Sequence, residues 1–121
     1  MNTITLYRPV GQKELDLIAA SGFTAFPPRL PEQPIFYPVL NEPYATQIAR
    51  DWNTRDAASG YIGHVLHFEV RADFLAAYTV QTVGASEHQE YWIPAGDLPV
   101  FNDAIVGAIE VAATYRPETK P

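Results

Sequence analysis

A few polar side chains in this sequence could bind or transform a ligand. Arg8 closes a short alternating segment, and a guanidinium at the end of a strand can bind a phosphate or carboxylate through paired hydrogen bonds. Arg29 lies in a proline-rich segment. Tyr7, directly before Arg8, and Tyr37, directly before Pro38, are aromatic residues that could contact a ligand. Glu90 opens an aromatic segment, where a carboxylate in a cleft would stabilise positive charge that develops on a reacting group.

Each candidate also has a purely structural explanation. Arg8 would suit a surface ion pair, and Glu90 would suit a solvated strand edge. Tyr44 and Trp52 are spaced for one face of a helix, and we expect them to pack in the core. Tyr37 precedes a proline outside that helix, so it is the better aromatic platform for a ligand.

Residue types and spacing exclude several other chemistries. The chain has no cysteine, which removes disulfides, thiolate nucleophiles and cysteine-bound metals. No serine stands in a Gly-x-Ser-x-Gly setting, and no glycine-rich segment is followed by the lysine of a phosphate-binding loop. His64 and His67 would point to opposite faces of a strand, so we predict no metal site there.

Length and charge limit the class of protein. The 121 residues suit a single domain over residues 1–121, and 47% hydrophobic residues against 18% charged ones predict a compact core. A net charge of −6 disfavours nucleic acid and anionic membranes as partners. No apolar stretch is long enough to span a bilayer and no leader is evident, so we expect a cytoplasmic protein.

The first half of the chain contains the elements that would position these side chains. Alternation predicts a strand over residues 4–10, and helical spacing predicts a helix over 12–21 that ends at Gly22. Five prolines make residues 26–38 an ordered loop with a short strand at 35–37. A second helix follows up to Trp52, with Asn41 as its N-cap.

The second half is mostly strands. Polar and small residues over 54–63 predict an exposed loop. Strands are expected over 66–70, 79–83, 90–93 and 109–115, with a helical turn at 73–78 capped by Asp73 and at best another turn within 95–103. Residues 116–121 are expected to fray. This order predicts an α+β domain with a curved or split mixed sheet and two to three short helices.

Four segments of the chain resemble short bacterial proteins that are labelled "ADP-ribosylation/crystallin J1". They are residues 6–9 (Leu-Tyr-Arg-Pro), 26–31, 35–52 and 90–95 (Glu-Tyr-Trp-Ile-Pro-Ala). Together they are similar to the ADP-ribosyltransferase-like fold. The crystallin part of the label implies a larger, all-helical, metal-dependent hydrolase, for which this chain is too short and too rich in strands.

The resemblance implies roles for named residues. Arg8 would contact the phosphate or ribose of NAD, and Tyr37 would face the nicotinamide. Tyr7 and Arg29 are further candidates for binding NAD. Glu90 matches the glutamate that hydrogen-bonds the nicotinamide ribose. NAD would be a substrate, with no metal required. Enzymes of this kind that modify arginine carry Glu-x-Glu, whereas His88 stands two residues before Glu90, which argues against an arginine acceptor.

Three functions follow from these observations. The first is an enzyme that cleaves the nicotinamide–ribose bond of NAD with Arg8, Tyr37 and Glu90. The second is an inactive module of the same fold that binds a nucleotide or a protein through residues 27–38. The third is a structural or regulatory protein that pairs with a partner protein through the strand containing Tyr91 and Trp92. An enzyme requires Arg8, Tyr37 and Glu90 to meet in one concave site.

Overall fold

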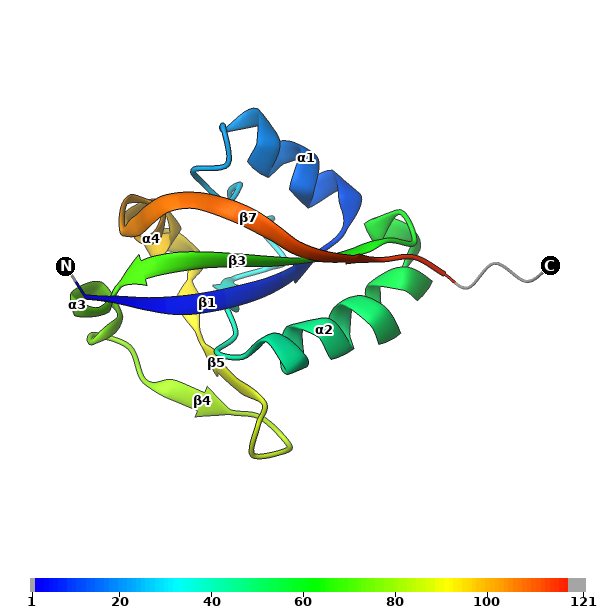
Figure 1. The fold of residues 1–121 in the computed structure, drawn as a ribbon. Helices are drawn as coiled ribbons and strands as arrows, with labels where there is room; N and C mark the ends of the chain where they lie inside the picture. The colour runs from blue at the N-terminus through cyan, green and yellow to red at the C-terminus, as the bar shows by residue number, and fades with distance from the viewer. Residues whose placement is uncertain (1, 118–121) are drawn as a thin grey trace.

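A computed structural model describes residues 2–117 of the chain (Figure 1). These residues form a small domain of helices and strands, which confirms that the chain is of mixed α and β class. The described part contains four α-helices, more than the two or three expected. The helices are α1 (Gln12–Ala20), α2 (Glu42–Asp51), α3 (Ala72–Leu75) and α4 (Leu98–Asp103). None of the helices within residues 2–117 is long and apolar enough to cross a membrane.

Seven strands in the described part form three antiparallel sheets. They are β1 (Thr3–Val10), β2 (Ile35–Phe36), β3 (Gly63–Arg71), β4 (Val80–Thr82), β5 (Gln89–Tyr91), β6 (Ile93–Pro94) and β7 (Ile105–Tyr115). The sheets have the strand orders β1-β3-β7, β2-β6 and β4-β5. The expected split of the sheet is present, but every pairing between described strands is antiparallel, so the prediction of a mixed sheet is wrong.

Val39 connects the central strands to the β4-β5 hairpin. It forms isolated bridges to Tyr7 on one side and to Glu90 on the other. The amide of Tyr7 donates to the Val39 carbonyl at 2.9 Å, and the Val39 amide donates back to Tyr7 at 2.8 Å. The Glu90 segment is therefore attached beside β1, although 82 residues separate Arg8 from Glu90 in the sequence.

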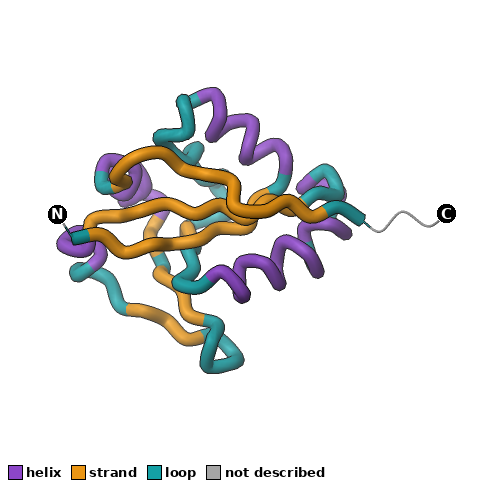
Figure 2. Tube along the Cα trace, viewed as in Figure 1, coloured by secondary structure: helices purple, strands orange, loops and turns teal. Residues whose placement is uncertain are grey.

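The two faces of the central strands carry different helices. Figures 1 and 2 show α1 and α2 on either side of these strands. On β1, Leu6, Arg8 and Val10 are buried, as the alternation of a strand requires. Leu6 and Val10 belong to the same core cluster as Ile18 of α1, whereas Tyr7 packs against the small cluster formed with α2. Arg8 is thus a charged residue on the main core face.

An aromatic cluster fixes the proline-rich segment to the body of the domain. Phe26 lies with its ring centroid 5.0 Å from that of Phe36 and 4.9 Å from that of Phe68. The side chain of Asn102 on α4 also accepts a hydrogen bond from the Phe26 amide at 2.9 Å and donates to its carbonyl at 3.0 Å. These contacts explain why a segment without regular structure is ordered, as predicted.

Helix α2 has a side-chain N-cap and a buried face of small residues. The Asn41 side chain accepts a hydrogen bond from the Tyr44 amide at 2.8 Å, which confirms the predicted N-cap. Ala45 and Ala49 form the buried face, so the helix backbone lies very close to the strands. At Gly63 on β3 a Cβ atom would collide with the carbonyl of Ala49. Trp52, 60% exposed, follows this helix, and its predicted place in the core is wrong because the alanines take that place.

The segment after α2 also differs from prediction. The polar composition of residues 54–63 predicts an exposed loop, but this part of the chain folds into two 3-10 turns, Asn53–Arg55 and Ala57–Ser59. Asn53, Thr54 and Ser59 are buried despite their polarity. Their hydrogen bonds to one another and to the backbone replace those to water, so polar composition does not place the segment outside.

Smaller differences affect the remaining elements. Strand β7 begins at Ile105, earlier than the predicted 109, and a full turn of helix α4 precedes it. Arg71, rather than Asp73, occupies the N-cap of α3. The predicted strand at 90–93 is divided at Trp92, because the chain leaves β4 as partner and pairs with β2. Of the expected frayed tail, Arg116 and Pro117 have no regular structure, and 118–121 lie outside the described residues.

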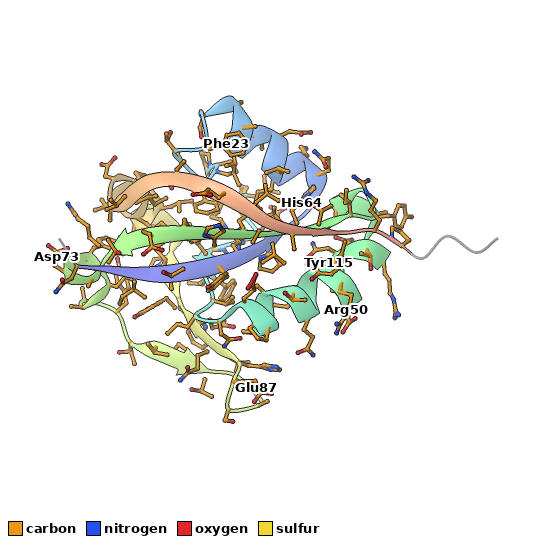
Figure 3. All side chains as sticks on the ribbon, viewed as in Figure 1. Phe23, Arg50, His64, Asp73, Glu87 and Tyr115 are labelled. Atoms are coloured by element: carbon orange, nitrogen blue, oxygen red, sulfur yellow. The ribbon has the colours of Figure 1, made fainter. Side chains whose placement is uncertain are left out.

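His64 is a buried titratable group in a defined tautomer. The Gln12 amide donates to Asp16 at 2.8 Å, so its oxygen faces His64 Nε2, also at 2.8 Å. Nε2 must therefore carry the proton, and Nδ1 accepts from Thr114 Oγ1 at 2.8 Å. Burial, and then the charge of Arg116, lower the pKa of His64 below its ordinary value. Figure 3 shows His64 among the strands.

We expect this histidine to make folding pH-dependent. Because its folded pKa is below the unfolded value of about 6.5, its neutral form contributes stability that is present above pH 6.5 and is lost as the pH falls. The free energy of unfolding, measured with urea from pH 8 to 5, should fall less in His64→Gln than in the wild type. His67→Gln, at a half-buried histidine of the same strand, serves as the control and should keep the wild-type slope. Equal slopes in all three proteins would contradict this account.

Candidate functional site

A cavity of about 800 Å³ lies between β1, α1, the proline-rich segment, α2 and β5. Arg8, Arg29, Tyr37 and Glu90 all line it, so the structure brings four of the five predicted site residues to one concave surface. Tyr7 does not line it, because its side chain points to the opposite face of β1 from Arg8 and packs beside α2. The volume is within the usual range of small-molecule sites, about 300–1,000 Å³.

Arg8 is the centre of the cationic region of the cavity. It is 8% exposed, and its Nε and Nη2 atoms donate to the two carboxylate oxygens of Glu14 at 2.6 and 3.0 Å. The guanidinium carbon also lies 4.6 Å from the ring centroid of Phe36. This paired contact and the ring face hold the guanidinium in one orientation and offset part of the cost of burying its charge. The alternative of a surface ion pair for Arg8 does not fit this burial.

Arg29 completes the cationic region from the proline-rich segment. Its guanidinium carbon lies 5.9 Å from the same Phe36 ring. Its Nε atom is buried and has no hydrogen-bond partner among the described residues. Burial first, and then the positive charge of Arg8, lower the pKa of Arg29, although an arginine remains protonated at neutral pH. The charges of Arg8 and Glu14 both act on Arg29, so two guanidinium groups against this one carboxylate leave an excess of positive charge for an anion.

Glu90 is the centre of the acidic region. Its side chain is buried, at 7% exposed, and both of its oxygens are engaged. Tyr44 Oη donates to Oε1 at 2.9 Å, and Trp92 Nε1 donates to Oε2 at 2.7 Å. These bonds hold the carboxylate rigidly at the cavity wall. Burial, and then the hydrogen bond to Glu90, raise the pKa of Tyr44 to about 12, so Tyr44 keeps its donated proton throughout the neutral range.

The local sequence explains this arrangement. Glu90 and Trp92 are two residues apart in extended chain, so their side chains share one side. Tyr44 comes from the first turn of α2, which Asn41 fixes. Asn41 also donates from its amide to the Glu87 carbonyl in the β4-β5 turn, which ties α2 to the hairpin. His88 stacks on the Tyr44 ring with centroids 4.3 Å apart.

Aromatic and apolar side chains complete the wall. Tyr37 is 41% exposed and lines the cavity, and its role as an aromatic platform for a ligand stays a prediction. Trp52 also lines the cavity, at the end of α2. Leu17 of α1 and Ile48 of α2 lie on the same wall. Such surfaces suit the faces of flat rings.

Within residues 2–117, no group of three or more histidine, aspartate or glutamate side chains is placed so that it could hold a metal ion. The charged residues that line the cavity are three cationic and three acidic, namely Arg8, Lys13, Arg29, Glu14, Asp56 and Glu90. Its recognition chemistry therefore depends on fixed guanidinium, carboxylate and aromatic groups.

Sequence reasoning missed several residues of this site. Trp92 could have been found from its spacing of two from Glu90, and Glu14 from its place in the first turn after Arg8. Tyr44 could not, because its partner Glu90 lies 46 residues away. Ser59 falls within the predicted exposed loop and Asn53 directly before it, and only the structure shows them at the cavity wall.

Glu14→Gln tests how the cationic region is balanced. The substitution leaves the buried Arg8 without its carboxylate, and we expect the free energy of unfolding to fall by about 1–3 kcal/mol. Because phosphate can replace the lost charge, 20 mM phosphate should raise the Tm of this variant more than that of the wild type. Differential scanning calorimetry with and without phosphate measures both. An equal phosphate effect on the two proteins would show that this region does not bind anions.

Comparison with known proteins assigns no family to the chain. No family model matches it, and no curated protein or solved structure matches it either. A proposal for the function therefore rests on the chemistry of the cavity and on the resemblance expected from the sequence.

Proposed function

We propose that this protein binds NAD and cleaves its nicotinamide–ribose bond, in the manner of an ADP-ribosyltransferase or an NAD glycohydrolase. One observation carries the proposal. A rigid buried carboxylate, Glu90, and two guanidinium groups, Arg8 and Arg29, line the same cavity. NAD has the complementary groups, because it joins a diphosphate to a ribose that becomes positively charged when the nicotinamide leaves.

Glu90 is suited to the bond-breaking step. When the bond between ribose C1′ and the nicotinamide nitrogen breaks, its electron pair leaves with the nitrogen, and positive charge passes to the sugar. A fixed carboxylate stabilises this oxocarbenium-like state as it forms. Tyr44 and Trp92 already orient both oxygens, so little reorganisation is needed during the reaction. The acceptor of the ribosyl group would then add to C1′.

The cationic region is suited to the diphosphate. Arg8 and Arg29 would bind its oxygens, with Lys13 at the same wall. The unpartnered buried Nε of Arg29 supports this fit, since a buried donor normally has an acceptor. The exposed ring of Tyr37 would contact the nicotinamide.

An inactive nucleotide-binding module is the second candidate. The observation that favours it is the paired contact between Arg8 and Glu14, which already satisfies one edge of the guanidinium. A module of this kind would bind the same dinucleotide without releasing nicotinamide. Turnover, rather than binding, therefore separates the two candidates.

Glu90→Gln should abolish catalysis while binding persists. The substitution keeps the shape of the side chain and removes the charge, so nicotinamide release from NAD should fall by at least about 100-fold. The glutamine amide retains one acceptor for Tyr44 or Trp92, and NAD affinity by calorimetry should change by less than about threefold. Chromatography of released nicotinamide measures turnover. Full turnover in the variant would exclude Glu90 as the catalytic carboxylate, whereas no turnover in the wild type would favour the binding module.

Glu87→Gln is the matched control for this experiment. Glu87 lies in the same hairpin, is exposed, and points away from the body of the domain (Figure 3). It carries the same change in charge without touching the cavity. Turnover in Glu87→Gln should equal that of the wild type.

Arg29→Gln should weaken binding of the phosphates. Loss of a charged contact to a phosphate typically costs about 1.5–3 kcal/mol, so NAD and ADP-ribose should bind about 10-fold to 100-fold more weakly. Free nicotinamide, which has no phosphate, should be unaffected. Arg50→Gln, an exposed arginine on α2, is the matched control (Figure 3). Equal NAD affinity in Arg29→Gln and Arg50→Gln would remove Arg29 from the site.

A further inference from the structure

Arginine and aromatic side chains gather at the end of the domain where α2 and β7 finish. We call them the arginine–aromatic surface, and its members are Arg50, Trp52, Arg55, Tyr61, Tyr115 and Arg116. Tyr115 is half-buried and the other five are exposed. Of these residues only Trp52 lines the cavity, and the mechanism proposed for Glu90 uses none of them.

Three chain segments that pack closely bring this surface together. Strands β3 and β7 pair so that Gly63 lies opposite Tyr115. The same glycine lies against the carbonyl of Ala49 on α2, where a Cβ atom would collide. The residues that follow Ala49, precede Gly63 and adjoin Tyr115 therefore meet at one end of the domain. Figure 3 shows Arg50 and Tyr115 at this end, whereas Asp73 lies at the opposite end.

Two aromatic side chains of this surface are not explained by core packing. Trp52 is 60% exposed, Tyr61 is 53% exposed, and neither belongs to a hydrophobic core cluster. Tyr61 also has a positive φ of 57°, directly after Gly60 with a φ of 71°. This left-handed region is unfavourable for a bulky side chain. The Asp56 carbonyl accepts from the Tyr61 amide at 3.1 Å and so closes the turn that holds the ring in solvent.

The arginines of this surface are available to a partner. Among residues 2–117, Arg55 and Arg116 form no ion pair. Arg50 pairs with its neighbour Asp51 at 3.0 Å, but both side chains are more than half exposed, so the pair contributes little. Asp51 and Asp56 are the acidic residues over 50–61 and 115–117. Three guanidinium groups thus stand against two carboxylates, in a chain with a net charge of −6.

The residue types indicate a protein partner with acidic side chains. Tryptophan, tyrosine and arginine are the residues that most often dominate the binding energy of protein–protein interfaces. Guanidinium groups bind carboxylates through paired hydrogen bonds, and exposed rings bury apolar side chains. A nucleic acid fits less well, because its affinity grows with the number of neutralised phosphates, and three arginines on a chain of net charge −6 neutralise few.

We propose that the arginine–aromatic surface binds an acidic segment of a partner protein. Its rings would contact apolar side chains of that segment, and its arginines would bind the carboxylates. This proposal goes beyond the proposed function and does not depend on it. Because Trp52 belongs to both the surface and the cavity wall, the bound segment would lie beside the candidate site.

Selection of displayed random peptides of about twelve residues on the wild-type protein tests this proposal. The selected peptides are synthesised with a fluorescent label and titrated by fluorescence anisotropy. They should be acidic and contain aromatic or large aliphatic residues. Trp52→Ala and Arg55→Gln should each bind them about 10-fold more weakly, and high salt should weaken binding to the wild type. Both side chains are exposed, so neither substitution should affect folding.

Arg71→Gln is the matched control for the change in charge. Arg71 ends β3, at the far end of that strand from Gly63, and its side chain is 39% exposed. This variant should bind the selected peptides like the wild type. Equal binding by Arg55→Gln and Arg71→Gln would overturn the proposal. So would a selection that enriches no peptide, or one that enriches neutral or basic peptides.

NMR of the isotope-labelled wild type locates the binding surface. The indole N–H signal of Trp52 and the amide signal of Tyr61 should shift when a selected peptide is added, and the indole signal of Trp92 should not. An oligothymidine of about twelve nucleotides that shifts the Trp52 and Tyr61 signals at lower concentration than the peptide would overturn the proposal and assign the surface to nucleic acid.

The test is independent of the proposed function. Glu90→Gln should bind the selected peptides like the wild type, because Glu90 does not belong to the arginine–aromatic surface. Peptide binding without nicotinamide release from NAD would support the surface and contradict the enzyme. Nicotinamide release without peptide binding would support the enzyme and overturn the surface.

Discussion

The burial of a guanidinium on the core side of β1 constrains most of this domain. Alternation along the strand places Arg8 between Leu6 and Val10, where water cannot solvate its charge. Burial of an unpaired charge costs several kcal/mol, so the fold must supply partners. Glu14 of α1 supplies the paired carboxylate and Phe36 supplies a ring face. The positions of α1 and of the proline-rich segment are therefore tied to the same side chain that gives the cavity its cationic region.

The acidic region contains a buried negative charge, Glu90, which other elements of the fold stabilise. The bridges of Val39 place Glu90 next to the central strands. Among the described residues, no cation pairs with the Glu90 carboxylate, and two neutral donors, Tyr44 and Trp92, hold it instead. A carboxylate held in this way keeps its negative charge available to a ligand. Since the cationic region belongs to β1, α1 and the proline-rich segment, and the acidic region to α2 and β5, an extended ligand with an anionic part and a developing cation meets both.

Local patterns are sufficient to predict most of the elements, and the site only in part. Strand alternation predicts β1, and the Asn41 cap with helical spacing predicts α2, but the burial of Arg8 on the core face was not predicted. Contacts between distant segments are not accessible in this way, as the bond from Tyr44 to Glu90 over 46 residues shows. Helical spacing predicts Trp52 in the core, but Trp52 is exposed because Ala45 and Ala49 form the buried face of the helix. Ser59 has the composition of an exposed loop, but polar groups that satisfy one another can be buried, and composition does not reveal their partners.

A structure of the protein with a carbocyclic NAD analogue, which cannot lose its nicotinamide, would test the central claim most directly. The account predicts diphosphate oxygens within hydrogen-bond distance of Arg8 or Arg29, and the nicotinamide ribose within hydrogen-bond distance of Glu90. An analogue bound with its phosphates away from both arginines, or bound outside this cavity, would contradict the account.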